Sequence, residues 1–203
     1  MVVQPVRFIR WLYPQALWRV KTVRREVYLT FDDGPVPEAT PWVLDLLKKK
    51  DVKATFFCVG QNVERHPAIY QRILDEGHAV GNHTHNHVKA WVLGHGEYLD
   101  NVKKAVPLIG TRLFRPPHGQ LWPWSVKGLK RMFDKIVMWD VLSFDYNKKI
   151  TSAQVLGNVK QYTRNGSVIV FHDSIKAWPH MHKVLPEAID WLLEQGYQFR
   201  TLE

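Results

Sequence analysis

The chain has 203 residues, of which 45% are hydrophobic, 23% charged and 12% aromatic, a composition typical of one globular domain and not of a disordered protein. Its single cysteine, Cys58, excludes an internal disulfide and a thiolate metal cluster, and its apolar surroundings indicate a buried strand residue. The net charge of +9 would attract any polyanion, but no nucleic-acid-binding motif is present, so we expect no nucleic-acid partner.

Residues 1–25 form a predicted N-terminal arm, followed by a single domain over residues 26–203. The arm mixes apolar residues with arginines. Such a segment either packs across the domain, which we favour, or lies on a membrane or another anionic surface as a basic amphipathic segment. It lacks the apolar centre and cleavage site of a secretory signal, and no apolar run is long enough to span a bilayer. We therefore expect a cytoplasmic or membrane-peripheral protein, and a monomer.

Strand-like and helix-like segments alternate along the domain, which indicates an α/β fold with a largely parallel sheet. Strands are predicted at residues 27–31, 53–59, 78–81, 135–141, 167–171 and 197–202. Helices are predicted from residue 41 onward and at residues 67–76, 97–109, 124–133, 152–162 and 184–193. Thr40 would cap the first helix, and Pro107 would kink the third or end it early. Six or seven strand–helix units favour a barrel smaller than the eight-unit type.

Polar clusters follow several of these strands, at the ends where parallel α/β folds place their sites. The first cluster is Asp32 and Asp33, followed by Gly34 and Pro35. Neighbouring side chains would point apart along a continuing strand, whereas a turn lets both carboxylates approach one site. One could bind a cation while the other stays ionised as a base. The alternative is an Asp-rich turn without a chemical role.

Three histidines, His83, His85 and His87, fall within the sequence HTHNH. His83 and His87 would share one face of a helical turn, whereas His83 and His85 would suit an extended strand. Two imidazoles at the first spacing are a common half-site for a divalent transition metal such as zinc. Asp33 could supply a third ligand, which leaves a coordination position open for water, as hydrolysis requires.

Three further clusters are less specific. In the sequence RPPHG, two prolines and a glycine make a rigid turn that could aim a backbone N–H at an oxyanion, and Arg115 could orient a carboxylate. Asp145 and Tyr146 could form a groove wall. His172 ends an apolar strand and could act as a general acid if a carboxylate raises its pKa. Each cluster taken alone could equally be structural.

Together these motifs resemble the polysaccharide deacetylase family, also called the NodB-homology domain or carbohydrate esterase family 4. The resemblance covers about residues 26–202. It rests on TFDDGP, HTHNH and RPPHG, and on two looser motifs around residues 145–146 and 170–173. It implies a single-domain, distorted (β/α)7-type barrel and one divalent metal, usually Zn²⁺ and sometimes Co²⁺ or another ion. It also implies an acetylated glycan as substrate.

The resemblance assigns roles to individual residues. The metal ligands would be Asp33, His83 and His87. Asp32 would be the catalytic base, which Arg115 would orient, and His172 would be the general acid, which Asp145 would support. The backbone N–H of His118 would hold the oxyanion. Val170 would contact the acetyl methyl group, and Tyr146 would contact the sugar.

Some positions depart from the usual family pattern. These departures affect which substrate we expect, but not which reaction. His118 stands where the third motif usually has Tyr, and Tyr146 where the fourth usually has Trp. Leu142 stands where an Asp is common, and Val170 where the fifth motif usually has Leu. The side chains that line the groove are therefore expected to differ from those of typical members.

The implied function is a metal-dependent hydrolase that removes acetyl groups from N-acetylated or, as an alternative, O-acetylated carbohydrate. Peptidoglycan, chitin-type oligomers, xylan and surface polysaccharide are all candidate substrates. Three rival functions are an inactive carbohydrate-binding protein with this fold, a hydrolase of cyclic imides or small amides, and a basic, membrane-associated structural protein. Every expected catalytic position is filled, which favours the enzyme.

Overall fold

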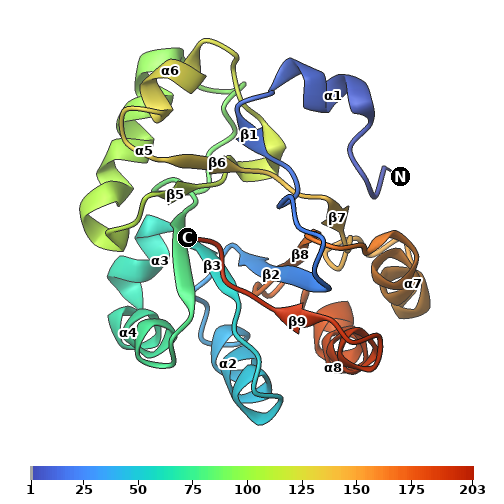
Figure 1. Cartoon of the computed structure of the whole chain (residues 1–203). Coiled ribbons are helices and arrows are strands. Elements are labelled where there is room, and N and C mark those ends of the chain that lie inside the picture. Colours follow the sequence, from blue (N-terminus) through green and yellow to red (C-terminus); the bar gives the residue numbers. More distant parts are fainter. Residues whose placement is uncertain (1) are drawn as a thin grey trace.

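The strands form one curled, mainly parallel sheet at the centre of the molecule (Figure 1). The computed structural model describes residues 2–203, apart from the side chain of Arg7. The strands are β1 (Ala16–Leu17), β2 (Glu26–Asp32), β3 (Thr55–Cys58), β4 (Ala79–Asn82), β5 (Leu113–Phe114), β6 (Lys135–Val137), β7 (Val141–Leu142), β8 (Val168–His172) and β9 (Gln198–Phe199). Their order is β1-β6-β5-β4-β3-β2-β8-β7, and β9 pairs with the start of β2. The order and curvature confirm the predicted barrel-like α/β fold, with β1 and β7 at the sheet edges.

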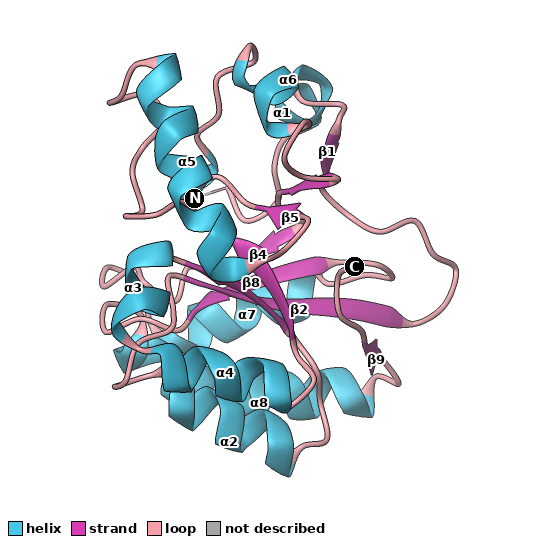
Figure 2. Ribbon diagram, turned by 90° about the vertical axis from the view of Figure 1, so that its left-hand side faces the viewer, coloured by secondary structure: helices cyan, strands magenta, loops and turns pink. Residues whose placement is uncertain are grey.

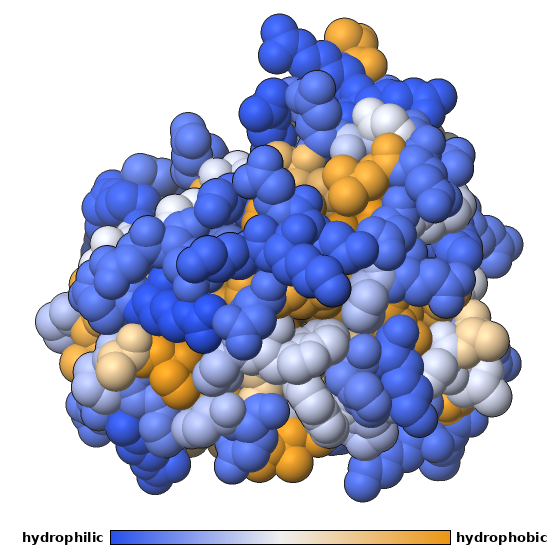
Figure 3. Space-filling view, turned by 90° about the horizontal axis from the view of Figure 1, so that it is seen from below, coloured by the Kyte–Doolittle hydropathy of each residue, from blue (hydrophilic) through white to orange (hydrophobic). Residues whose placement is uncertain are grey.

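Helices surround the outside of the curled sheet (Figure 1); in the view of Figure 2, α1, α5 and α6 lie above the strands, and α2, α4 and α8 lie below. The helices are α1 (Arg7–Leu12), α2 (Thr40–Lys49), α3 (Gly60–Arg65), α4 (Pro67–Asp75), α5 (His95–Ile109), α6 (Ser125–Leu129), α7 (Ser152–Tyr162) and α8 (Trp178–Glu194). The buried faces of α2 and α8 meet the apolar side chains of β2 and β8 in the main core. Their outward face is largely hydrophilic (Figure 3), as expected of amphipathic helices on a sheet.

Several predicted elements are corrected by the structure. The apolar run 135–141 is two strands with different neighbours, because β6 pairs with β5 whereas β7 pairs with β8. Helix α5 continues through Pro107 to Ile109. Thr40 is the first residue of α2 and not its N-cap, since its hydroxyl accepts the backbone N–H of Val36 and donates to Asp173.

The N-terminal segment adds a strand to the sheet. β1 pairs with β6 in parallel, and Val3 and Trp18 are buried. Tyr13 donates a hydrogen bond from its hydroxyl to the carbonyl of Leu121, at 2.5 Å. Phe8 and Trp11 of α1 remain exposed and stack on each other. The boundary between the arm and the domain at residue 25 stays a prediction, and so does a contact of the arm with a membrane. Among the described residues, we find no helix that is long and apolar enough to cross a membrane.

The sheet order brings the polar clusters together. The ends of β5, β4, β3, β2 and β8 are consecutive neighbours in the sheet. Asp32 is the last residue of β2 and pairs in register with His172, the last residue of β8. His83 directly follows β4, and Arg115 directly follows β5. Because parallel strands end at the same edge, these four residues lie on one rim.

Candidate active site

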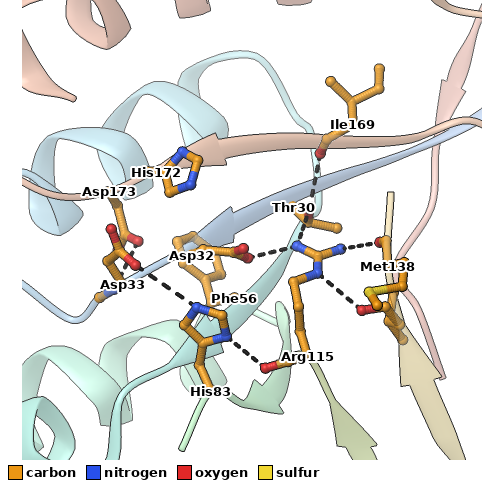
Figure 4. Close-up of polar contacts among 12 residues, drawn as sticks. Thr30, Asp32, Asp33, Phe56, His83, Arg115, Met138, Ile169, His172 and Asp173 are labelled. Atoms are coloured by element: carbon orange, nitrogen blue, oxygen red, sulfur yellow. Dashed lines mark hydrogen bonds and ion pairs between the residues drawn. The ribbon is translucent and has the colours of Figure 1, made fainter. Parts of the chain in front are cut away.

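A buried ion pair lies at the centre of the rim (Figure 4). Nη1 of Arg115 donates to Oδ1 of Asp32 at 2.6 Å and to the hydroxyl of Thr30 at 2.8 Å. Nη2 donates to the carbonyl of Met138 at 3.0 Å. The guanidinium also lies 4.0 Å from the ring centre of Phe57, which closes its other side. Arg115 therefore cannot rotate away from Asp32 without losing several contacts at once.

Three potential metal ligands converge beside this pair. Ligand atoms of Asp33, His83 and His87 all lie within 4.8 Å of one another. Oδ1 of Asp33 is 3.0 Å from Nε2 of His87 and 3.8 Å from Nε2 of His83. Asp33 has a left-handed φ of 85°, which turns the chain just after β2. The turn places the neighbouring carboxylates of Asp32 and Asp33 in one pocket.

The polar contacts of these residues fit a bound cation. Nδ1 of His83 donates to the carbonyl of Arg115 at 2.8 Å, so its Nε2 has a free lone pair directed toward Asp33. Burial lowers the pKa of His83 to about 4, which keeps the ring neutral. Burial alone would raise the pKa of Asp33, but the contact with His87 and the nearby imidazoles lower it below its usual value. Within the described part of the chain, the buried Oδ1 of Asp33 has no hydrogen-bond donor of suitable geometry.

The histidine loop differs from both predicted conformations. His83 and His87 lie in neither a helix nor a strand, and Thr84 and His87 have left-handed φ values of 65° and 58°. Oδ1 of Asn82 accepts the backbone N–H of Thr84 at 2.8 Å and stabilises this turn. His85 turns away toward Glu64, 3.7 Å from its carboxylate. The spacing was a useful signal, but the backbone that realises it was not a helix.

His172 and Asp145 form a second polar pair across the pocket. Nδ1 of His172 donates to Oδ1 of Asp145 at 2.8 Å, and the His172 backbone N–H donates to Oδ2 at 2.8 Å. Burial would lower the pKa of His172, but the ionised Asp145, with smaller contributions from Asp33 and Asp32, raises it to about 9. His172 is therefore protonated at neutral pH and can donate a proton into the pocket.

The pocket between these groups has a volume of about 700 Å³. His118, Tyr146 and Val170 line it, as does Leu142. The His118 ring packs on His87 at 4.7 Å between ring centres, and Tyr146 meets His172 edge-on at 4.8 Å. The structure thus brings the residues predicted for the site to one pocket, except that Asp145 is buried behind His172 and does not line it. Their chemical roles, including that of the His118 backbone N–H, stay predictions.

Asp173 and Trp139 are two of the residues at or beside the pocket that were missed from the sequence. Asp173 is buried behind Asp33, where it accepts the Gly34 N–H at 3.1 Å and the Thr40 hydroxyl at 2.5 Å. A Cβ at residue 34 would lie 2.0 Å from Asp173, so the turn needs glycine there. Burial, with help from Asp33, raises the pKa of Asp173 to about 8. Its position directly after His172 was the available signal.

Trp139 is another omission. It lines the pocket, and a Cβ at residue 119 would lie 2.4 Å from its ring, so Gly119 allows the loop to approach it closely. Trp139 stood in an apolar run that predicted only a strand. The strand break after β6, which turns the ring toward the pocket, has no sequence signal of its own.

Comparison with known proteins agrees with this geometry. A family profile described as polysaccharide deacetylase matches residues 19–132. A Bacillus cereus protein named peptidoglycan-N-acetylglucosamine deacetylase is 35% identical over 190 residues, which cover 88% of this chain and 67% of the relative.

Solved structures agree as well. The crystal structure of a peptidoglycan N-acetylglucosamine deacetylase, Bc1960, superposes with a TM-score of 0.83 at 32% identity, covering 95% of this chain and 94% of the other. A protein of Bacillus anthracis described as a CE4 family pseudoenzyme has a TM-score of 0.82 at 28% identity, covering 93% and 68%. With the curled parallel sheet and the convergent motifs at its rim, these matches establish that the chain belongs to the polysaccharide deacetylase family.

Proposed function

We propose that this protein is a metal-dependent hydrolase that removes acetyl groups from an N-acetylated glycan. The observation that supports this most directly is the convergence of Asp33, His83 and His87 within 4.8 Å, next to Asp32. A carboxylate base and a protonated imidazole face the same pocket from different strands. Relatives named as peptidoglycan-N-acetylglucosamine deacetylases make N-acetylglucosamine of peptidoglycan the first substrate to test.

The chain offers a complete set of groups for amide hydrolysis. Asp33, His83 and His87 would hold one divalent cation, which would supply Lewis-acid polarisation of the acetyl carbonyl. We propose Zn²⁺ because two imidazoles and one carboxylate are typical of catalytic zinc sites, with Co²⁺ as the alternative. The backbone N–H of His118 would share the developing negative charge on the oxygen.

Proton transfers would run between two fixed residues. Asp32, oriented by the hydrogen bond from Arg115, accepts a proton from water as the water oxygen bonds to the acetyl carbon. His172, charged through Asp145, gives its proton to the sugar nitrogen as the C–N bond breaks. The products are acetate and a free amine. Val170 would contact the acetyl methyl group, and Tyr146 would form one wall of the sugar site.

The test is acetate release from N-acetylated oligosaccharides, including peptidoglycan fragments and chitin-type oligomers. Activity should disappear with a chelator and return with Zn²⁺ or Co²⁺. Asp32→Asn should reduce turnover by about 10²-fold or more while the bound metal stays, and His83→Ala should lose the metal itself. Full activity in the chelated protein or in either variant would contradict the proposal.

An inactive binding protein is the main rival, because a similar structure is described as a pseudoenzyme. In this chain each position expected to act chemically has a suitable side chain, which favours activity. Metal content measured together with acetate release separates the two. A protein that binds Zn²⁺ and acetylated oligomers but releases no acetate under any metal condition would be the binding protein.

A further inference from the structure

Three tryptophans gather at the surface: Trp124 stacks on the half-buried Trp122, and Trp91 is tilted by 51° against Trp122. The rings of Trp122 and Trp124 are 4.7 Å apart with an interplanar angle of 14°, and Trp91 lies 6.3 Å from Trp122. Trp91 and Trp124 are each 59% exposed. Contact between water and large apolar ring faces is unfavourable. A group of exposed apolar side chains is therefore typical of a binding site.

The group of tryptophans is held rigidly. Nε1 of Trp122 donates to the carbonyl of Ala90 at 2.8 Å, which joins the loop after β4 to the loop after β5. Ala90 and Leu121, the neighbours of Trp91 and Trp122, are buried in the apolar cluster beneath α5 and α6. The ring faces are therefore presented by a fixed surface, so that a ligand would bind without a large ordering cost.

The two loops that carry the tryptophans also carry residues that line the candidate active site. Trp91 follows His87 in one loop, and Trp122 follows His118 in the other. His87 and His118 themselves pack together in the pocket wall. Both loops leave the carboxyl ends of their strands and lead to α5 and α6, above the sheet in Figure 2. A ligand that extends from the pocket along these two loops would therefore meet the tryptophans.

The chemistry of the surface favours a sugar chain. The C–H faces of a pyranose ring are apolar and flat, so they stack on indole rings while the hydroxyl groups stay in water. We propose that Trp91, Trp122 and Trp124 form a platform that binds sugar units of the glycan outside the catalytic pocket. This inference rests on the proposed function. It adds that the enzyme acts on polymeric glycan in preference to short fragments.

The test compares N-acetylglucosamine oligomers of two and six units. In the double variant Trp91→Ala/Trp124→Ala, KM for the hexamer should rise about tenfold, as expected for two lost stacking contacts, while kcat for the hexamer and both constants for the dimer stay unchanged. Trp122 stays intact because it joins the two loops. When residue 91 is replaced by Tyr instead of Ala, KM for the hexamer should return most of the way to the wild-type value. Trp11→Ala, which removes another tryptophan, 73% exposed, is the matched control and should have no effect.

Binding measured without turnover separates this inference from the proposed function. Calorimetric titration of the chelated protein with the hexamer should give an affinity about tenfold tighter than that of the double variant. If the wild type releases no acetate yet binds the hexamer through the tryptophans, the proposed function fails and the platform stands. Equal hexamer binding by the wild type and the double variant would overturn the platform. The platform would also be overturned if the double variant lost only its binding to phosphatidylglycerol vesicles, because this result would assign the tryptophans to a membrane contact.

Discussion

Nη1 of Arg115 lies 2.6 Å from Oδ1 of Asp32, and both side chains are buried, with 1% and 8% of their surfaces exposed. A charge in such surroundings depends on its partner, because removal of one member leaves the other without compensation. The pair therefore affects both the chemistry of the site and the stability of the fold.

Arg115→Met is expected to destabilise the protein by about 3–5 kcal/mol, the usual cost of an unpaired buried charge. Urea unfolding followed by circular dichroism measures this change. In the double variant Arg115→Met/Asp32→Leu neither charge remains, so part of the stability should return. A double variant that loses the sum of the two single effects would show that the ion pair is not the cause.

The alkaline limit of activity should depend on Asp145. His172 must be protonated to act as an acid, and its pKa of about 9 predicts that kcat/KM falls as pH rises through that value. Asp145→Asn removes the carboxylate that raises the pKa of His172, so the fall should move toward neutral pH by one unit or more, about the effect of one close charge. Tyr146→Phe, which keeps the ring beside His172, is the control. An unchanged alkaline limit in Asp145→Asn would exclude His172 as the acid.

His78 should make the fold sensitive to mild acid. Burial, with help from Lys53, lowers the pKa of His78 to about 4, and its Nδ1 accepts the Ala54 N–H at 3.2 Å. The unfolded chain binds a proton below the ordinary pKa of about 6.5, whereas the folded state does not bind it until about 4. Stability is therefore fully present above 6.5 and falls by up to about 3 kcal/mol as pH decreases to about 4.

His78→Asn keeps an acceptor near Ala54 but cannot be protonated in this range. We expect its unfolding free energy to change less between pH 7 and pH 4 than that of the wild type. The measurement is urea unfolding at a series of pH values. Identical pH dependence in the two proteins would show that other groups, such as His83, dominate acid unfolding.

The N-terminal segment should contribute stability through Asp140. This fully buried carboxylate accepts hydrogen bonds from Arg10 at 2.7 Å, from Arg164 at 2.8 Å and from Ser167 at 2.8 Å. Asp140→Asn removes the negative charge that two arginines share and replaces one acceptor oxygen by an NH₂ donor, so it should cost about 2–4 kcal/mol. Asp134→Asn breaks an exposed pair with Arg112 and should change the stability much less, because solvent screens exposed ion pairs. Equal thermal melting shifts in the two variants would contradict this difference.

Much of the site was predictable because its residues directly follow strands. Asp32 and His172 end apolar runs whose length and composition already predicted buried strands, and parallel strands bring such ends together. The three proposed ligands were chosen from residue types and spacing, which reflect the needs of metal binding more than the local backbone. For this reason the sequence could suggest that His83 and His87 lie close to Asp33, as they do, even though neither histidine lies in a helical turn; their role as ligands stays a prediction.

Other features depend on contacts between distant residues. β5 has only two residues, too few for any periodicity, and it exists because it pairs with β4 and β6. The split of residues 135–141 depends on which neighbour each half meets, which an apolar run cannot reveal. Thr40 has the residue type of a cap but bonds to Asp173 across the fold instead. In each case tertiary contacts decided between local alternatives.

Arg115 also fixes His83, because its carbonyl accepts the imidazole Nδ1–H while its guanidinium binds Asp32. A single residue thus contacts the proposed metal ligand His83 through its main chain and the proposed base Asp32 through its side chain. Because Asp32 belongs to β2 and His83 follows β4, Arg115 links two neighbouring parts of the rim that are otherwise anchored by separate strands. An insertion or deletion at Arg115 would therefore remove a hydrogen bond from both groups at once.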